Sequence, residues 1–208
     1  RQPRNAEAHY VLALSAMYQN RPAEALPAID KAVSLAGADP QFHFIRGLCL
    51  AGAGRADESI AAYRKAVVLR PEFFEAWANL GNLLERTGQW AGAEEAYGHA
   101  IRLRPGAGPV LNGLGMCALA RGDRERACQL FSGAVAADPA SPTARNNLGH
   151  TLGKLKRAEE GLAHLREAVR LNPGYAVAWV NLGELCYSSG RDAEAVEAID
   201  RALALDPA

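Results

Sequence analysis

The chain has 208 residues, and its 23 basic and 23 acidic residues give a formal net charge of zero. A balanced charge leaves no electrostatic footprint for nucleic acid or for an anionic membrane, so we expect neither as a partner. No apolar stretch is long enough to cross a bilayer, so we expect no membrane insertion, and the N-terminal Arg1-Gln2-Pro3-Arg4 is not typical of a signal peptide.

A period of 34 residues runs through the chain and overrides the one or two globular domains that length alone would favour. It is marked by six alanines, Ala32, Ala66, Ala100, Ala134, Ala168 and Ala202. A small residue precedes each alanine by 19 positions, and a bulky apolar residue precedes it by three. Small residues let two helix backbones approach closely while the bulky one fills the gap, so each period predicts a helical hairpin. The motif sets six repeats, at 6–39, 40–73, 74–107, 108–141, 142–175 and 176–208.

The first repeat departs from the others in its second helix. Pro22 suits a first helical turn, but Pro27 removes an intrahelical hydrogen bond, so we expect the helix to bend or begin late near Leu26. Gly37 stands where the later repeats end in a proline.

In the second repeat, Arg46 stands where every other repeat has a leucine. A buried charge is costly unless it is paired, so we expect the guanidinium to turn to solvent or to meet a carboxylate. Gly54 aligns with Gly88, Gly122 and Gly190, which identifies the turn between the two helices.

The third repeat shows the pattern most clearly, with a first helix over 76–86, a turn over 87–90 and a second helix over 91–103 that ends before Pro105. In the fourth repeat, residues 113–118 match a dinucleotide fingerprint, but no strand pattern precedes them and Gly115 is the packing glycine of the repeat. We therefore expect no nucleotide or other cofactor.

The side chains that most often carry chemistry have structural explanations here. We expect the four cysteines, at positions 49, 117, 128 and 186, to be small buried hydrophobes, and no C-x-x-C pair or His/Cys cluster indicates a metal site. His9 and His43 fall where Trp77 and Trp179 stand, which indicates packing residues with a polar edge. Only His150 is expected in a groove, and no nucleophile is placed beside it, so we predict no catalytic residues.

These residues resemble a known family. The third repeat resembles a tetratricopeptide repeat, and the sixth is similar; the third carries the pattern in Trp77, Leu80, Gly81, Ala93, Tyr97, Ala100 and Pro105. The resemblance implies an all-α, right-handed superhelical solenoid of six helix-turn-helix repeats. It also implies that the first helices line a concave groove for an extended peptide or a partner protein, and it implies no enzyme activity.

The ends of the chain fall in register with the repeats. Pro3 lies 34 residues before Gly37, and the chain stops at Pro207-Ala208 without a polar capping helix. We interpret the chain as part of a longer protein and expect that its uncapped ends favour self-association. The cysteines, as reduced thiols, favour a cytoplasmic location.

The groove expected from this resemblance has two halves. Repeats one and two supply an apolar and aromatic surface formed by Tyr10, Leu14, Tyr18, Phe44 and Leu48. The later repeats supply a polar surface formed by Asn79, Asn82, Asn112, Asn146, Asn147, His150, Lys154, Asn181 and Glu184. The apolar half is either a binding surface or a face that a further N-terminal helix or repeat covers.

Three asparagines, Asn79, Asn147 and Asn181, share the sixth position of their repeats, with Asn112 just beside that position in the fourth. An amide offers both a donor and an acceptor, so a ladder of amides can hold the backbone of a peptide of any sequence. A similar ladder marks the repeat domain of O-linked N-acetylglucosamine transferases. The alternative is that asparagine is simply a common solvated residue in such a groove.

The expected function is therefore non-catalytic recognition of a peptide or partner protein. The alternative is a substrate-docking domain of a larger enzyme, such as a glycosyltransferase or a sulfotransferase. A clamp for a C-terminal carboxylate, as in chaperone-binding members of this family, is excluded because the fifth position of every repeat lacks a basic residue.

Overall fold

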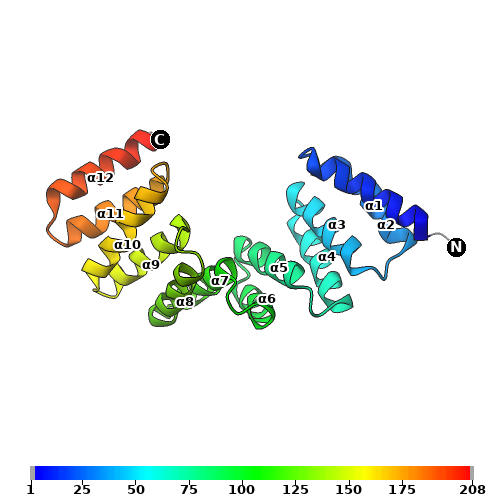
Figure 1. Cartoon of the computed structure of the whole chain (residues 1–208), viewed down its shortest axis with the longest axis horizontal. Helices are drawn as coiled ribbons and strands as arrows, with labels where there is room; N and C mark the ends of the chain where they lie inside the picture. Colours follow the sequence, from blue (N-terminus) through cyan, green and yellow to red (C-terminus); the bar gives the residue numbers. More distant parts are fainter. Residues whose placement is uncertain (1–2, 207–208) are drawn as a thin grey trace. The chain divides into compact units, whose positions relative to one another are not determined.

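The computed structural model describes residues 3–206, and this part of the chain is built from twelve helices without a strand. Figure 1 shows them as successive antiparallel pairs joined by short turns. The helices are α1 (Pro3–Tyr18), α2 (Pro22–Leu35), α3 (Pro40–Gly52), α4 (Ala56–Leu69), α5 (Phe74–Arg86), α6 (Trp90–Leu103), α7 (Gly108–Ala120), α8 (Arg124–Ala137), α9 (Pro142–Lys154), α10 (Ala158–Leu171), α11 (Ala176–Ser188) and α12 (Asp192–Leu205). The predicted all-α class is confirmed. Residues 1, 2, 207 and 208, including the expected terminating Pro207, lie outside the described part.

The chain divides into two compact units, Arg1–Arg104 and Pro105–Ala208, with three hairpins in each. In the first unit α2 packs on α3 and α4 on α5, and in the second α8 packs on α9 and α10 on α11. First helices are also neighbours, since α1 contacts α3 and α9 contacts α11. Within each unit, successive hairpins therefore bury their apolar faces against one another, as repeat arrays require.

The turn inside each hairpin has the same backbone geometry in all six repeats. Its central residue has a positive φ, between 55° and 81°, a conformation that glycine adopts without steric cost. Four repeats place glycine there, and the first and fifth place Asn20 and Lys156. The turn predicted at Gly54, Gly88, Gly122 and Gly190 is therefore confirmed, with two positions that sequence alignment of glycines alone would miss.

Each hairpin is closed by a small residue on its first helix and a bulky residue on its second. A Cβ added at Gly115 would clash with the Phe131 ring, and one added at Gly81 would lie 2.5 Å from Cδ1 of Tyr97. Both rings are buried in the core. A small residue at this position is thus favoured by close helix approach, as predicted, and glycine leaves room for the ring where the second helix carries an aromatic residue.

A second recurrent contact ties four of the first helices, α3, α5, α9 and α11, to the turn before them. At the fourth position of a repeat, a side-chain N–H donates to the backbone carbonyl oxygen six residues earlier, at 2.7–2.9 Å. His43 is one of these donors, so its predicted role as a packing residue with a polar edge is confirmed. The pairs are His43 with Gly37, Trp77 with Pro71, Arg145 with Pro139 and Trp179 with Pro173.

The late helix start expected near Leu26 was wrong, while the bend expected there stays a prediction. Helix α2 begins at Pro22 and continues through Pro27 to Leu35. Pro27 is exposed, and so is Ala23, whose carbonyl would have accepted the missing N–H, so water can satisfy that oxygen. Buried side chains on both sides of Pro27, Leu26 and Ile29, hold the helix against the core.

Two other expectations are confirmed. Arg46 Nε donates to Asp30 Oδ1 at 2.6 Å, across the junction between α3 and α2, and its side chain is 28% exposed. All four cysteines are buried and free, and burial raises the pKa of the Cys49 thiol to about 11.

The glycine–aromatic contacts predict unequal costs for adding a methyl group. In the first repeat Ala13 already stands opposite Ile29, the same pair that Gly183→Ala would form with Ile199. We therefore expect Gly183→Ala to leave the free energy of unfolding nearly unchanged, while Gly115→Ala lowers it by about 1 to 3 kcal/mol because the buried Phe131 ring must shift. Urea titrations would measure both, and equal effects would contradict this explanation.

The Arg46–Asp30 ion pair is half-exposed, and such pairs contribute little net stability. We expect Arg46→Leu to change the free energy of unfolding by less than about 1 kcal/mol, or to raise it, because leucine occupies this position in every other repeat. Thermal melts followed by circular dichroism would check this. A large loss would show that the charge itself is structurally required.

Candidate functional site

The first helices of the second unit are joined by hydrogen bonds between side chains. Asn147 on α9 donates through Nδ2 to Asn112 Oδ1 on α7 at 3.0 Å. Asn146 Nδ2 donates to Asn147 Oδ1 at 3.1 Å, and Asn181 on α11 donates through Nδ2 to Asn146 Oδ1 at 2.8 Å. His150 Nδ1 lies 3.0 Å from Asn181 Oδ1. We call Asn112, Asn146, Asn147, Asn181 and His150 the asparagine network.

The network has a direction. An amide oxygen can only accept, so His150 Nδ1 carries the proton that is donated to Asn181. Each of the four amide oxygens already accepts a hydrogen bond. An amide nitrogen has two N–H groups, and those of Asn146, Asn147 and Asn181 each donate one to another amide oxygen, whereas that of Asn112 donates to none of them. All four amide oxygens are thus satisfied within the network, which has more amide N–H donors than amide oxygen acceptors.

Burial within the network is uneven. Asn146 is 3% exposed, so the residue that links α9 to α11 is part of the interior. Asn112, Asn147 and Asn181 are half-buried and keep one side at the surface. The network therefore combines one structural amide with three amides that a ligand can reach.

A pocket of about 420 Å³ lies next to the network, between α9 and α11. Two network residues, His150 and Asn181, form part of its wall. Its other lining residues are Gly153, Lys154, Lys156, Glu184, Leu185 and Ser188.

The predicted ladder at the sixth repeat position is not uniform. Asn79, in the first unit, donates through Nδ2 to the backbone oxygen of Glu75 in its own helix at 2.8 Å. Asn82 is exposed on the same helix, and Glu184 is exposed at the pocket. The structure thus brings Asn112, Asn147, Asn181, His150 and Glu184 to one region of the second unit.

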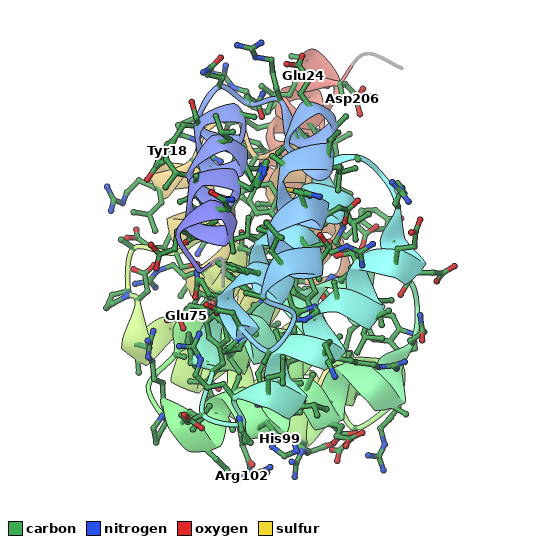
Figure 2. The ribbon with its side chains drawn as sticks, turned by 90° about the vertical axis from the view of Figure 1, so that its right-hand side faces the viewer. Tyr18, Glu24, Glu75, His99, Arg102 and Asp206 are labelled. Carbon is green, nitrogen blue, oxygen red and sulfur yellow. The ribbon has the colours of Figure 1, made fainter. Side chains whose placement is uncertain are left out.

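Most of the predicted aromatic surface packs between helices of the first unit. Tyr10 contacts Phe42, with ring centroids 5.2 Å apart, and Phe44 contacts Phe73 at 4.9 Å. Leu14 and Leu48 also pack, half-buried, against the core of this unit. Tyr18 differs, because it is 90% exposed near the end of α1 (Figure 2).

Sequence reasoning placed Asn146 and Lys154 on the groove surface and gave no role to Lys156. The sequence signal for the burial of Asn146 was the Asn146-Asn147 doublet, because two adjacent residues of a helix do not point in the same direction. The signal for Lys156 was the concentration of lysines, because the chain has only four lysines and one residue separates Lys156 from Lys154.

Other chemistries have little support in the part of the chain that the structure describes. Within residues 3–206, no three histidine, cysteine or acidic side chains gather to hold a metal ion. No helix in the same range has the length and apolar character of a membrane-spanning segment. What the second unit offers is a set of oriented hydrogen-bond donors beside a small pocket.

Comparison with protein families gives matches along nearly the whole chain. A family model described as "Tetratricopeptide repeat" matches residues 10–72, 78–142 and 146–208. The human protein O-mannosyl-transferase TMTC1 is 36% identical over 83 residues, which cover 37% of this chain and 9% of that protein. The chain therefore matches less than a tenth of the length of this relative.

Solved structures with the same fold include three repeat proteins. YrrB, described as a TPR protein with an unusual peptide-binding site, has a TM-score of 0.70 at 22% identity, covering 86% of this chain and 93% of its own. PilF of Pseudomonas aeruginosa has a TM-score of 0.84 at 16% identity, covering 98% and 92%. The Cut9–Hcn1 complex has a TM-score of 0.80 at 20% identity, covering 100% and 41%. At these identities the likeness shows the fold.

The buried position of Asn146 gives a stability prediction. Asn146→Ala would leave Asn147 Oδ1 and Asn181 Nδ2 without their partner, so we expect the free energy of unfolding to fall by about 1 to 3 kcal/mol. The exposed Asn82→Ala serves as the control and should change it by less than about 0.5 kcal/mol. Chemical denaturation would compare them, and an equally small effect of both would show that the network adds nothing to stability.

Proposed function

Because this chain belongs to the tetratricopeptide repeat family, we propose that it is a non-catalytic scaffold that binds an extended peptide or partner protein on its first helices. The observation that carries the proposal is the asparagine network, which places amide donors of three successive first helices in one hydrogen-bonded row. Peptide backbones present one carbonyl acceptor per residue, so a row of donors can bind them without reading their sequence.

The network also reduces the cost of binding. Amides that hold one another in place lose less rotamer freedom when a ligand arrives than separate surface asparagines would. Asn147 and Asn181 are fixed in this way, whereas Asn79 is fixed only to its own helix. We therefore assign backbone recognition to the second unit.

The first unit has a different part in this proposal. Tyr18 is its most exposed aromatic side chain, while Tyr10 and Phe44 are engaged in packing. Tyrosine offers a large apolar contact area at a small entropic cost, which suits an anchor for an apolar ligand side chain. YrrB, whose description names a peptide-binding site, lends support by its similar fold.

The composition favours one class of partner and one kind of cellular compartment. The zero net charge favours a protein or peptide over nucleic acid. Four free cysteines favour a reducing compartment such as the cytoplasm.

The second candidate is a substrate-docking domain within a larger enzyme. The observation that favours it is the 36% identity to part of TMTC1, whose name describes an O-mannosyl-transferase. Sequencing the coding region on both sides of this segment tests it. A glycosyltransferase domain on the same polypeptide would support the docking role, and further repeats alone would favour the simple scaffold.

Peptides selected from a random phage-displayed library provide the test of the scaffold proposal. We expect the Asn147→Ala/Asn181→Ala variant to bind the selected peptides more weakly by about 1 to 3 kcal/mol for each amide lost, measured by calorimetry. Asn79→Ala, at the same repeat position, is the matched control and should cost less, because that amide already bonds within its own helix.

Circular dichroism melts would first confirm that each variant is folded. If the selection recovers no peptide, or if the folded double variant binds as tightly as the parent, backbone recognition by this network is wrong.

A further inference from the structure

The pocket between α9 and α11 holds half of the lysines of the chain. The sequence has four lysines, and Lys154 and Lys156 both line this pocket. Lys154 ends α9, and Lys156 lies in the turn that follows. The remaining two, Lys31 and Lys65, are exposed on α2 and α4 of the first unit.

These two lysines are unpaired in a region where arginines are paired. Lys154 and Lys156 make no ion pair with any residue in the range 3–206. By contrast, four arginines of the same two repeats each contact a glutamate oxygen at 2.6–2.8 Å. The pairs are Arg157 with Glu160, Arg166 with Glu194, Arg170 with Glu167 and Arg191 with Glu159. The positive charge at the pocket is therefore available to a ligand.

Lys156 is also held in an unfavourable backbone conformation. Its φ is 61°, at the turn position where Gly54, Gly88, Gly122 and Gly190 stand in other repeats. A lysine in this conformation costs about 1 kcal/mol relative to glycine. The side chain thus occupies the pocket at a position where the fold would be more stable without it, a pattern typical of functional sites.

The charge around the pocket suits a carboxylate. Glu184 is the one acidic residue in its lining, so the two lysines leave an excess of one positive charge. One excess charge matches a carboxylate better than a phosphate, and no arginine is present to grip phosphate oxygens with two parallel hydrogen bonds. Leu185, which lies against Gly153, gives the pocket an aliphatic wall for the methylene groups of an acidic side chain.

We propose that this pocket binds an aspartate or glutamate side chain of the peptide held by the asparagine network. The inference rests on the proposed function and adds a sequence preference to it. The network holds the backbone of the peptide, and the pocket beside His150 and Asn181 selects an acidic residue at one fixed position. Recognition is thereby limited to a subset of extended peptides.

The probe is a random phage-displayed peptide library, selected separately on the parent chain and on Lys154→Gln/Lys156→Gln. We expect parent-selected peptides to share an acidic residue at one position and variant-selected peptides to lack it. Lys31→Gln/Lys65→Gln is the matched control, since it changes the charge equally in the first unit and should keep the acidic preference.

One selected peptide and its copy with the acidic residue changed to the amide then give the affinities by calorimetry. On the parent the change should weaken binding by about fivefold to tenfold, more at low salt than at high salt. On Lys154→Gln/Lys156→Gln the two peptides should bind equally. Glu184→Gln should tighten binding of the acidic peptide by about twofold to fivefold, because a like charge is removed.

Lys156→Gly separates binding from folding. It should raise the thermal stability, because glycine suits the left-handed turn, and should weaken binding of the acidic peptide. Peptides selected without an acidic preference, or with an unchanged one on the lysine variant, would overturn this inference and leave peptide binding intact. Failure to recover any peptide would instead count against the proposed function itself.

Discussion

The close approach of the two helices in each hairpin is the contact on which the rest of this structure depends. At that crossing a side chain on the second helix fills the space that a missing Cβ leaves on the first, as Tyr97 does against Gly81. The contact is made within one repeat, so both of its partners come from the same hairpin. It also sets which face of the first helix is left over for packing on the preceding repeat and which is left for a ligand.

The face left for a ligand differs between the two units. In the first, aromatic side chains such as Phe44 fold back against the core and add to packing. In the second, the corresponding positions carry amides that bond from helix to helix. A polar network at this place is favourable only because its acceptors are nearly all satisfied within it, since a half-buried amide without partners would cost free energy.

The features that follow from backbone sterics were predictable from the sequence. Helix pairs, turns and the packing glycines repeat every 34 residues because each hairpin has the same local steric requirements. The late helix start expected near Leu26 did not occur, because Pro27 lies on the exposed side of a helix whose buried Leu26 and Ile29 hold it against the core. Asn146 was placed wrongly for a similar reason: its partners lie on other helices, and a period fixes the register of a residue but not the side-chain conformation that joins three helices.

The hydrogen bond between the fourth residue of a repeat and the preceding turn can be made by chemically different donors. Imidazole, indole and guanidinium groups all serve, since the acceptor is a backbone carbonyl that every sequence supplies. Mutation can therefore exchange the donor without moving the helix that carries it. Drift of this kind is compatible with the 16–22% identity between this chain and solved structures that share its fold. A helix position that depends on a backbone acceptor can persist while the side-chain donor is replaced. Sequence identity is then a poor measure of structural similarity.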